Sequence, residues 1–305
     1  MALGLAGVSV SAVLVRLADA PVSAIAFWRL TLSLLLILPL LGLSGQWREV
    51  GSLSRSEWRW VALSGGALAL HFVTWFLSLD YTSVASSTVL VTAHPLYVGL
   101  LSTLWLREPP SRLEWVAILI ATSGAVWIGW GDFRLGEGAF IGDLLAALAA
   151  FFAALYFIAG RRLRLRLGLW SYVAPVYLLA ALLTGISMWV RGVPAIGYPP
   201  ATWALFAGMA IGPMLLGHTS FNWALRHVRA YVVSLVVLLE PVGATVLAVL
   251  VLGAAERPSM NTVTGGIAIL IGMAMLVREQ ARRSSTPMSP VTNNNKRQQR
   301  MTAEE

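Results

Sequence analysis

The sequence of 305 residues contains no cysteine, a single lysine and few charged residues of any kind, only 12%. The lack of cysteine excludes disulfides and thiolate metal sites from this sequence. The charged fraction lies far below the roughly 25% of soluble domains, whereas 57% of the residues are hydrophobic and the mean hydropathy is +0.74. This composition predicts a protein that crosses a membrane several times.

Motifs for several common chemistries are also missing. The sequence has no Walker A loop and no H-E-x-x-H, C-x-x-C or G-x-S-x-G motif, so direct ATP drive and the usual hydrolytic or metal-dependent reactions have no support. We therefore expect no enzyme activity, no cofactor and no metal. The net charge of +8 does not indicate nucleic acid binding, because the arginines lie in short clusters between apolar segments, as in membrane proteins.

Apolar runs of about 20 residues, the length that a helix needs to span a bilayer, recur along the whole chain. Ten can be placed, at residues 2–18, 22–42, 59–79, 84–106, 113–130, 140–160, 170–190, 201–224, 231–253 and 260–277. The first run has a signal-peptide alternative, because Ala18-Asp19-Ala20 resembles a cleavage site, but it lacks a basic start. The sequence thus predicts an all-helical membrane protein with ten transmembrane helices.

Basic residues are unevenly divided among the predicted loops. If the C-terminus is cytoplasmic, the inner loops hold most arginines, and the outer loops keep only Arg134, Arg191 and Arg257. This positive-inside pattern predicts that both termini are cytoplasmic. Residues 279–305 carry no apolar run to pack and are predicted to be a disordered cytoplasmic tail.

Two parts of the sequence align with each other, with a two-residue insertion after the fourth helix. The aligned pairs are Trp75 and Phe221, His94 and Glu240, Pro95 and Pro241, and Gly124 and Gly272. The chain therefore divides into two five-helix halves, residues 1–131 and 139–278. Because five is odd, the halves are predicted to cross the membrane in opposite directions, as in transporters whose sites lie between inverted repeats. Gene duplication with a purely structural role is the alternative.

The five-plus-five layout, the segment AFWRL in the second helix and the segment LLEPVGATVLAVLVLGAAERPSMNTVTGGIAILIGMAML resemble the EamA family of the drug/metabolite transporter superfamily. The resemblance covers nearly the whole predicted membrane part. It implies a ten-helix exporter in a bacterial inner membrane, acting on an amino acid or another small metabolite. The first half departs from the repeat at His94, where the second half has Glu240.

Polar residues inside the predicted helices mark candidate sites, because a charge at the bilayer centre costs about 2.5–3.5 kcal/mol on insertion scales. His94 and Glu240 precede Pro95 and Pro241, which open the helix backbone. One interpretation is structural, with both side chains bonded to freed backbone groups or to each other. In the other, His94 binds substrate and Glu240 carries a coupled proton, since a carboxyl group removed from water favours its protonated form. Pro213 is predicted to kink the eighth helix, and all three prolines are candidates for static bends or gating elements.

The third and eighth helices supply a second set of candidates. His71 and Trp75 are four residues apart, as are His218 and Asn222, so each pair shares a helix face. We expect both pairs to point into one cavity and bind substrate. For Trp75, the alternative is an anchor at the membrane interface, and for His71 it is a buried structural histidine.

Two further residues have open roles. Tyr156 either lines the cavity or anchors the sixth helix. Arg29 lies too deep in the second helix for a loop position, so it either snorkels outward or binds a substrate carboxylate or phosphate. Ser9 and Ser11 are expected to bond back to carbonyls of their own helix.

These features predict a secondary transporter that exports a small metabolite, such as an amino acid, by alternating access, with Glu240 as the candidate for proton coupling. The expected partners are a small-molecule substrate and membrane lipids, with no nucleic acid; we expect a monomer and leave a dimer open. Three alternatives remain. For an uncoupled facilitator, Glu240→Gln would leave the transport rate and its pH dependence nearly intact. A lipid-head-group flippase would move lipid without solute flux, and a membrane scaffold would move no solute.

Overall fold

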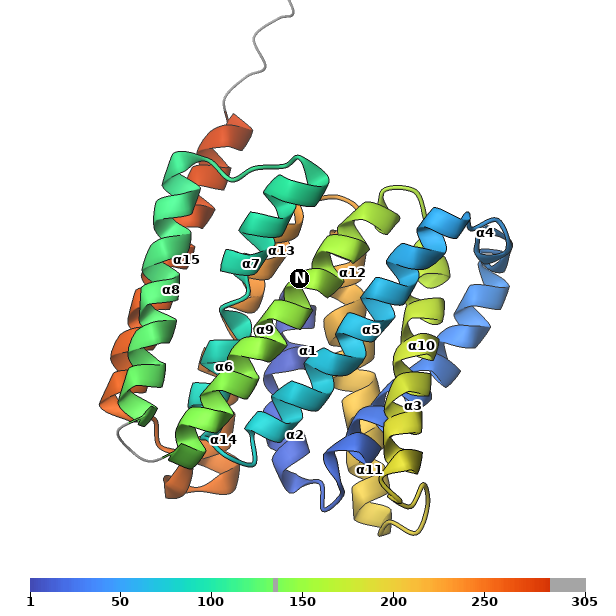
Figure 1. Cartoon of the computed structure of the whole chain (residues 1–305), viewed down its shortest axis with the longest axis horizontal. Helices are drawn as coiled ribbons and strands as arrows, with labels where there is room; N and C mark the ends of the chain where they lie inside the picture. The colour runs from blue at the N-terminus through green and yellow to red at the C-terminus, as the bar shows by residue number, and fades with distance from the viewer. Residues whose placement is uncertain (134–136, 286–305) are drawn as a thin grey trace, which may run out of the picture.

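The computed structural model describes residues 1–133 and 137–285, and their regular elements are all helical (Figure 1). The elements before residue 134 are α1 (Ala2–Ser9), α2 (Ser11–Leu17), α3 (Val22–Leu43), α4 (Trp47–Gly51), α5 (Arg55–Ser78), α6 (Val84–Thr92), α7 (Pro95–Leu101), η1 (Ser102–Leu106) and α8 (Arg112–Phe133). Local signals set several of these bounds. At the start of α5, Ser54 and Glu57 form a reciprocal capping box, which satisfies two backbone donors that the helix leaves free.

The elements after residue 136 are α9 (Glu137–Arg164), α10 (Leu169–Val190), α11 (Pro200–Met209), η2 (Ala210–His218), α12 (Thr219–Ala224), α13 (Ala230–Val237), α14 (Glu240–Leu252), η3 (Ala254–Glu256) and α15 (Met260–Ser285). The last helix is longer than predicted. Because α15 continues to Ser285, the chain does not become a tail at residue 279, and residues 286–305 lie outside the described part of the chain.

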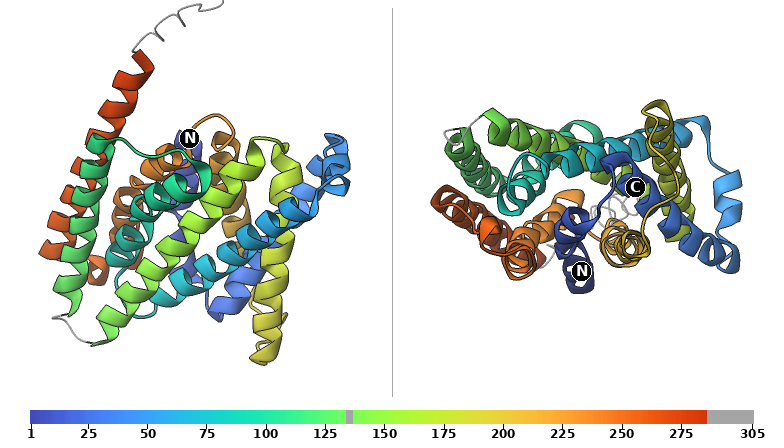
Figure 2. Two further views of the ribbon diagram at one scale, coloured as in Figure 1. Left: turned by 45° about the horizontal axis from the view of Figure 1, so that its top comes forward. Right: turned by 90° about the horizontal axis from the view of Figure 1, so that it is seen from below.

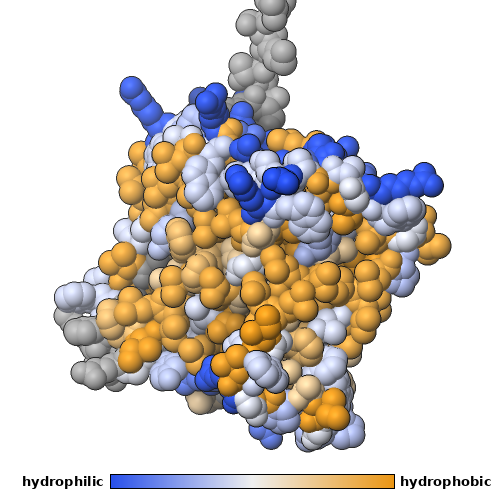
Figure 3. All heavy atoms as spheres, turned by 45° about the vertical axis from the view of Figure 1, so that its right-hand side comes forward, coloured by the Kyte–Doolittle hydropathy of each residue, from blue (hydrophilic) through white to orange (hydrophobic). Residues whose placement is uncertain are grey.

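Eight helical stretches in the described residues are long and apolar enough to cross a membrane. The N-terminal pair α1 and α2 is apolar as well, but Ala2–Leu17 is shorter. Many large apolar side chains are exposed on these helices, and Figure 3 shows them as a broad hydrophobic band below a strongly hydrophilic end of the molecule. Since backbone groups in lipid must be paired internally, helices with an apolar outer surface suit a bilayer. The protein is a multi-pass membrane protein.

The prolines of the predicted spans lie at irregular points in the helices. Pro95 begins α7 after a turn at His94, and Pro241 is the second residue of α14, which begins at Glu240. Each of these two spans is therefore interrupted by a short turn directly before its proline-containing helix. Pro213 lies within η2, which is π-helical, so the eighth predicted span widens locally around this residue.

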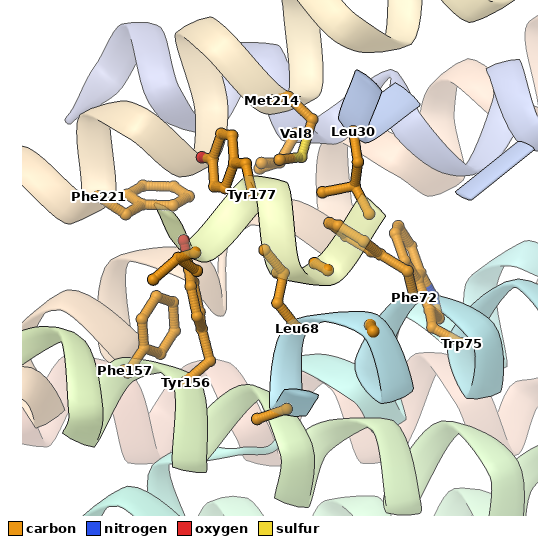
Figure 4. Close-up of a cluster of buried hydrophobic side chains, with 14 of the residues drawn as sticks. Val8, Leu30, Leu68, Phe72, Trp75, Tyr156, Phe157, Tyr177, Met214 and Phe221 are labelled. Carbon is orange, nitrogen blue, oxygen red and sulfur yellow. The ribbon is translucent and has the colours of Figure 1, made fainter. Parts of the chain in front are cut away.

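Helices from the two halves of the sequence pack against each other throughout the bundle. α5 lies along α9, α3 along α10 and α8 along α15, as two views agree (Figures 1 and 2). In addition, α1 packs against η2. Between these helices lies a core of aromatic and aliphatic side chains, with Tyr156 and Phe157 on one side and Phe72 and Trp75 on the other (Figure 4).

The pairing of α8 with α15 depends on glycine, because the two backbones approach each other closely. A Cβ atom at Gly265 would lie 2.6 Å from the carbonyl oxygen of Gly124 and 2.5 Å from Ile128. At Gly266, the next residue of α15, a Cβ atom would meet nothing within 4 Å. Close backbone approach of this kind is how small residues hold membrane helices together.

We therefore expect Gly265→Leu to separate α8 from α15 and to lower the stability of the protein by about 1–3 kcal/mol, the usual cost of overpacking, or more. Gly266→Leu is the matched control, since it adds the same side chain to the same helix in open space. Thermal unfolding in detergent, followed by tryptophan fluorescence, measures both. Equal melting temperatures for the two variants would contradict the close packing.

Candidate functional site

A small cavity of about 30 Å³ lies at the centre of the bundle. Its lining comes from both halves of the sequence. The polar residues around it are Ser11, Arg29, His71, Trp75, Thr92, His94, Tyr156, His218 and Glu240. The structure thus brings together the histidines, the glutamate, the arginine and the aromatic residues that the sequence singles out from six different predicted spans.

Arg29 reaches this cavity from α3 and is fully buried. Its Nη1 donates to Ser11 Oγ at 2.8 Å, and its guanidinium carbon lies 4.3 Å from the centre of the Phe72 ring. Its Nε and Nη2 are buried and have no hydrogen-bond partner among the described residues. Arg29 therefore does not snorkel to the surface, and it offers unused, charge-assisted donors at the cavity.

Glu240 is the first residue of α14 and is only 6% exposed. The N-terminal end of a helix favours a negative charge, because its free N–H groups carry partial positive charge. Glu240 and Arg29 line the same cavity, yet within the described part of the chain they are not joined by an ion pair. A carboxyl group and a guanidinium thus face one small space without neutralising each other through direct contact.

Three aromatic or imidazole rings cover another side of the cavity. His71 Nδ1 lies 3.0 Å from the carbonyl oxygen of Ala149, and because a carbonyl only accepts, Nδ1 carries the hydrogen and donates it. The His71 ring stacks on Trp75 at 5.9 Å and meets His218 at 6.1 Å. Trp75 is 3% exposed, so it is a cavity residue and does not lie at the membrane surface.

His94 also faces the cavity, from the turn between α6 and α7. Its ring meets Phe157 edge-on, with centroids 5.3 Å apart. In the described residues its Nδ1 finds no hydrogen-bond partner. The structural interpretation, in which His94 bonds the backbone opened by Pro95, is therefore not realised through Nδ1.

Asn222 lies behind the cavity and does not line it. Its Nδ2 donates to Tyr156 Oη at 2.6 Å, and its backbone carbonyl accepts from Arg164 Nε at 2.9 Å. Tyr156 lines the cavity, whereas Asn222 is not one of its lining residues. The four-residue spacing from His218 predicts that Asn222 points into the cavity, but the structure does not place it there. Asn222 instead holds Tyr156 through a hydrogen bond.

Ser11 was not expected at the site. Ser9 donates to the carbonyl of Leu5 at 2.9 Å, as predicted, but Ser11 accepts from Arg29 on another helix instead of bonding back. Thr92 lines the cavity as well and had no signal in the sequence. Serine and threonine are common in membrane helices, so their identity alone does not separate a site residue from a back-bonded one.

The size of the cavity limits what this conformation can hold. A space of about 30 Å³ admits water, whereas pockets for small molecules measure roughly 300–1,000 Å³. The polar residues thus lie around one space that is too small for a solute in this conformation. Binding a solute here requires the surrounding helices to move apart.

Comparisons with known proteins agree with this architecture. A family model described as the EamA-like transporter family matches residues 1–130 and again residues 140–278. A relative from Archaeoglobus fulgidus, described as an uncharacterized transporter, is 25% identical over 240 residues, which are 76% of this chain and 81% of that protein. A solved structure described as the crystal structure of a protein is similar with a TM-score of 0.70 at 21% identity, covering 93% of this chain and 96% of that one. At this identity the likeness is one of fold.

Proposed function

The chain belongs to the EamA-like transporter family, and from this premise we propose that it exports an amino acid across a bacterial inner membrane by alternating access. Membership makes it a membrane transporter. The identity of the solute, the direction of transport and the coupling are the content of the proposal. The single observation that carries it is the closed cavity into which Arg29 and Glu240 both face.

The proposed architecture is ten spans in two inverted halves, residues 1–131 and 139–278, with both termini cytoplasmic. The separate family matches at residues 1–130 and 140–278 support two related halves. The N-terminal pair α1 and α2 completes the first half, although it is short. Arginines gathered in the loops at one end support the orientation through the positive-inside rule, and the cavity between halves suits alternating access.

The proposed solute is a zwitterion. Arg29 has buried donors to spare, and a guanidinium binds a carboxylate in a bidentate manner. Glu240 on another helix can accept from an ammonium group. Trp75 and Phe221 supply apolar lining beside these charges, which suits the side chain of an amino acid. Buried charges are retained in membranes mainly where they serve such functions.

The proposed coupling is an exchange of protons for solute at Glu240. When the carboxyl group is ionised, it attracts the ammonium of the solute; when it is protonated, that attraction is lost. Proton and solute therefore compete for one group, and alternating access then couples their movements in opposite directions. A proton gradient directed into the cell drives solute out.

Efflux of a pool of labelled amino acids from proteoliposomes tests the proposal. We expect flux above that of empty liposomes, and faster flux when the far side of the membrane is acidified. Lipid scrambling, measured on the same vesicles, separates a flippase from a solute transporter. Absence of amino acid flux from well-folded protein would contradict the proposed solute.

Ser11 and Ser9 provide a matched pair for a smaller effect. Ser11→Ala removes the hydrogen bond that orients Arg29, whereas Ser9→Ala removes only a bond to the backbone of its own helix. Because a hydrogen bond to a charged group is worth about 1.5–3 kcal/mol, we expect Ser11→Ala to raise the KM for the transported amino acid by at least about tenfold. Ser9→Ala is expected to leave KM unchanged. Equal KM values for the two variants would show that Ser11 does not position Arg29.

A further inference from the structure

Three ion pairs join the two halves of the sequence in the described residues; the most exposed joins Arg166 to Glu57, and the other two lie at opposite ends of the helix bundle. At one end, Arg16 of α2 lies 3.2 Å from Glu256 of η3. At the other end, Arg161 of α9 lies 3.0 Å from Glu108, just after η1. In Figure 1 the end of α2 lies at the bottom of the bundle and the end of α9 at the top. The central cavity lies between them.

The arginines of the two ion pairs each make a second contact of the same kind. Arg16 Nη2 also donates to the carbonyl of Thr82 at 2.9 Å, and Arg161 Nη1 donates to the carbonyl of Leu225 at 2.9 Å. Each arginine thus links a glutamate of the opposite half to the turn that follows the third predicted span of its own half. These turns follow α5 and α12. An arginine suits this task, because it offers several donors in a fixed planar arrangement.

Both glutamates belong to the same short sequence pattern. Residues 108–111 read E-P-P-S and residues 256–259 read E-R-P-S, and each segment leads into the last helix of its half. A residue with positive φ ends η1 and another ends α14, Arg107 with φ 57° and Gly253 with φ 91°. The chain reverses there, which places each glutamate against the first helix of the other half.

The pairs are neither fully buried nor fully solvated. The side chains of Arg16 and Glu256 are 31% and 10% exposed, and those of Arg161 and Glu108 are 11% and 22% exposed. Such partly hydrated charges attract each other more strongly than exposed pairs, yet they avoid the full desolvation cost of buried ones. Each contact is therefore suited to form and break repeatedly.

From this arrangement we infer that the two ion pairs are reciprocal locks, one closing each end of the transport cavity. Both are formed in this structure, and the cavity between them is closed. Opening toward one side breaks the pair at that side while the other pair holds the halves together. Arg16, Glu256, Arg161 and Glu108 are thus positioning residues for transport. The inference rests on the proposed function, which supplies the need for alternating access.

The chain contains no cysteine, so a single introduced thiol reports access to the cavity. Thr92→Cys places the thiol at the cavity wall, where Thr92 is 1% exposed. A membrane-impermeant maleimide is added to one side of proteoliposomes with protein of known orientation. The rate of labelling from each side is then compared in Thr92→Cys alone and in combination with Glu256→Gln or Glu108→Gln.

We expect Glu256→Gln to speed labelling from the α2 end by at least about tenfold, because removing one charge of the pair favours the open state. Glu108→Gln is expected to speed labelling from the opposite end only. Asp80→Asn is the control at the α2 end, since Asp80 is an exposed acid near Arg16. Adding Arg16→Gln to Glu256→Gln should produce no further increase, since both changes remove the same contact between the halves, and the other bond of Arg16, to Thr82, lies within one half.

Labelling rates that are alike in Glu256→Gln and Asp80→Asn, or that rise equally from both sides, would overturn the inference. The assay needs no transported solute, so it is independent of the proposed function. Side-specific labelling without amino acid flux would support the ion-pair locks and contradict the proposal that the solute is an amino acid. Amino acid flux, with labelling rates that Glu256→Gln and Glu108→Gln leave unchanged, would support the proposed transport function and contradict the ion-pair locks.

Discussion

Replacement of Arg29 by methionine is expected to remove transport of the amino acid almost completely. Two donor groups of Arg29 are buried without partners in the described residues, and we assign them to the solute carboxylate. Hydrogen bonds between charged groups are worth about 1.5–3 kcal/mol each, so losing a bidentate contact should raise KM by roughly a hundredfold or more. Initial rates of exchange in proteoliposomes, over a range of solute concentrations, measure this change.

The same replacement should not unfold the protein. A buried charge with incomplete pairing contributes little net stability, and an apolar side chain of similar length often replaces it without loss. Arg191 is exposed in the loop after α10, so Arg191→Met is the matched control for loss of a positive charge. If Arg29→Met transports as well as Arg191→Met, then Arg29 does not hold the solute, and its role is to order α2 through Ser11.

Replacement of Glu240 by glutamine is expected to abolish the response to a proton gradient. Glutamine keeps the shape of the side chain but cannot exchange a proton or attract an ammonium group as an anion. We expect several-fold slower exchange of the amino acid, and the residual rate should be the same with and without acidification of the far side. Efflux measured with and without an imposed pH difference, at constant membrane potential, separates the two effects.

Asp19→Asn is the control for this variant, because Asp19 is an exposed acid in the turn after α2. It should retain both the rate and the response to pH. A Glu240→Gln protein that still accelerates in a proton gradient would contradict coupling at this residue. If Glu240→Gln transports at the normal rate, and neither this variant nor the unchanged protein responds to pH, the result would support the uncoupled facilitator.

Much of the site was visible in the sequence because a membrane makes polar residues expensive. His71, His94, His218 and Glu240 stood out within apolar runs, and all four line one cavity. The internal alignment matched His94 with Glu240. The prolines that follow them, Pro95 and Pro241, lie at the starts of α7 and α14. The helices also fall on the predicted apolar runs, because span length and hydrophobicity set their positions.

Other features depend on contacts that sequence spacing does not determine. Ser11 and Arg29 lie on different helices, so their hydrogen bond had no periodic signal. Asn222 is four residues from His218, but in the structure it is bonded to Tyr156, which lines the cavity, and does not line the cavity itself. The ion pair of Arg16 with Glu256 joins residues from opposite ends of the chain. The helical residues beyond residue 278 were missed because residues 279–285 read EQARRSS, and such a polar segment has no apolar periodicity that would predict a helix.

The most direct test of the central claim, that one cavity holds both charges of a zwitterion, is competition for exchange of a labelled amino acid by three unlabelled compounds. These are the same amino acid, its amide, which lacks the carboxylate, and its N-acetyl derivative, which lacks the ammonium. We predict strong inhibition by the amino acid alone, with the amide and the N-acetyl compound at least about tenfold weaker. Equal inhibition by all three would contradict recognition by Arg29 and Glu240.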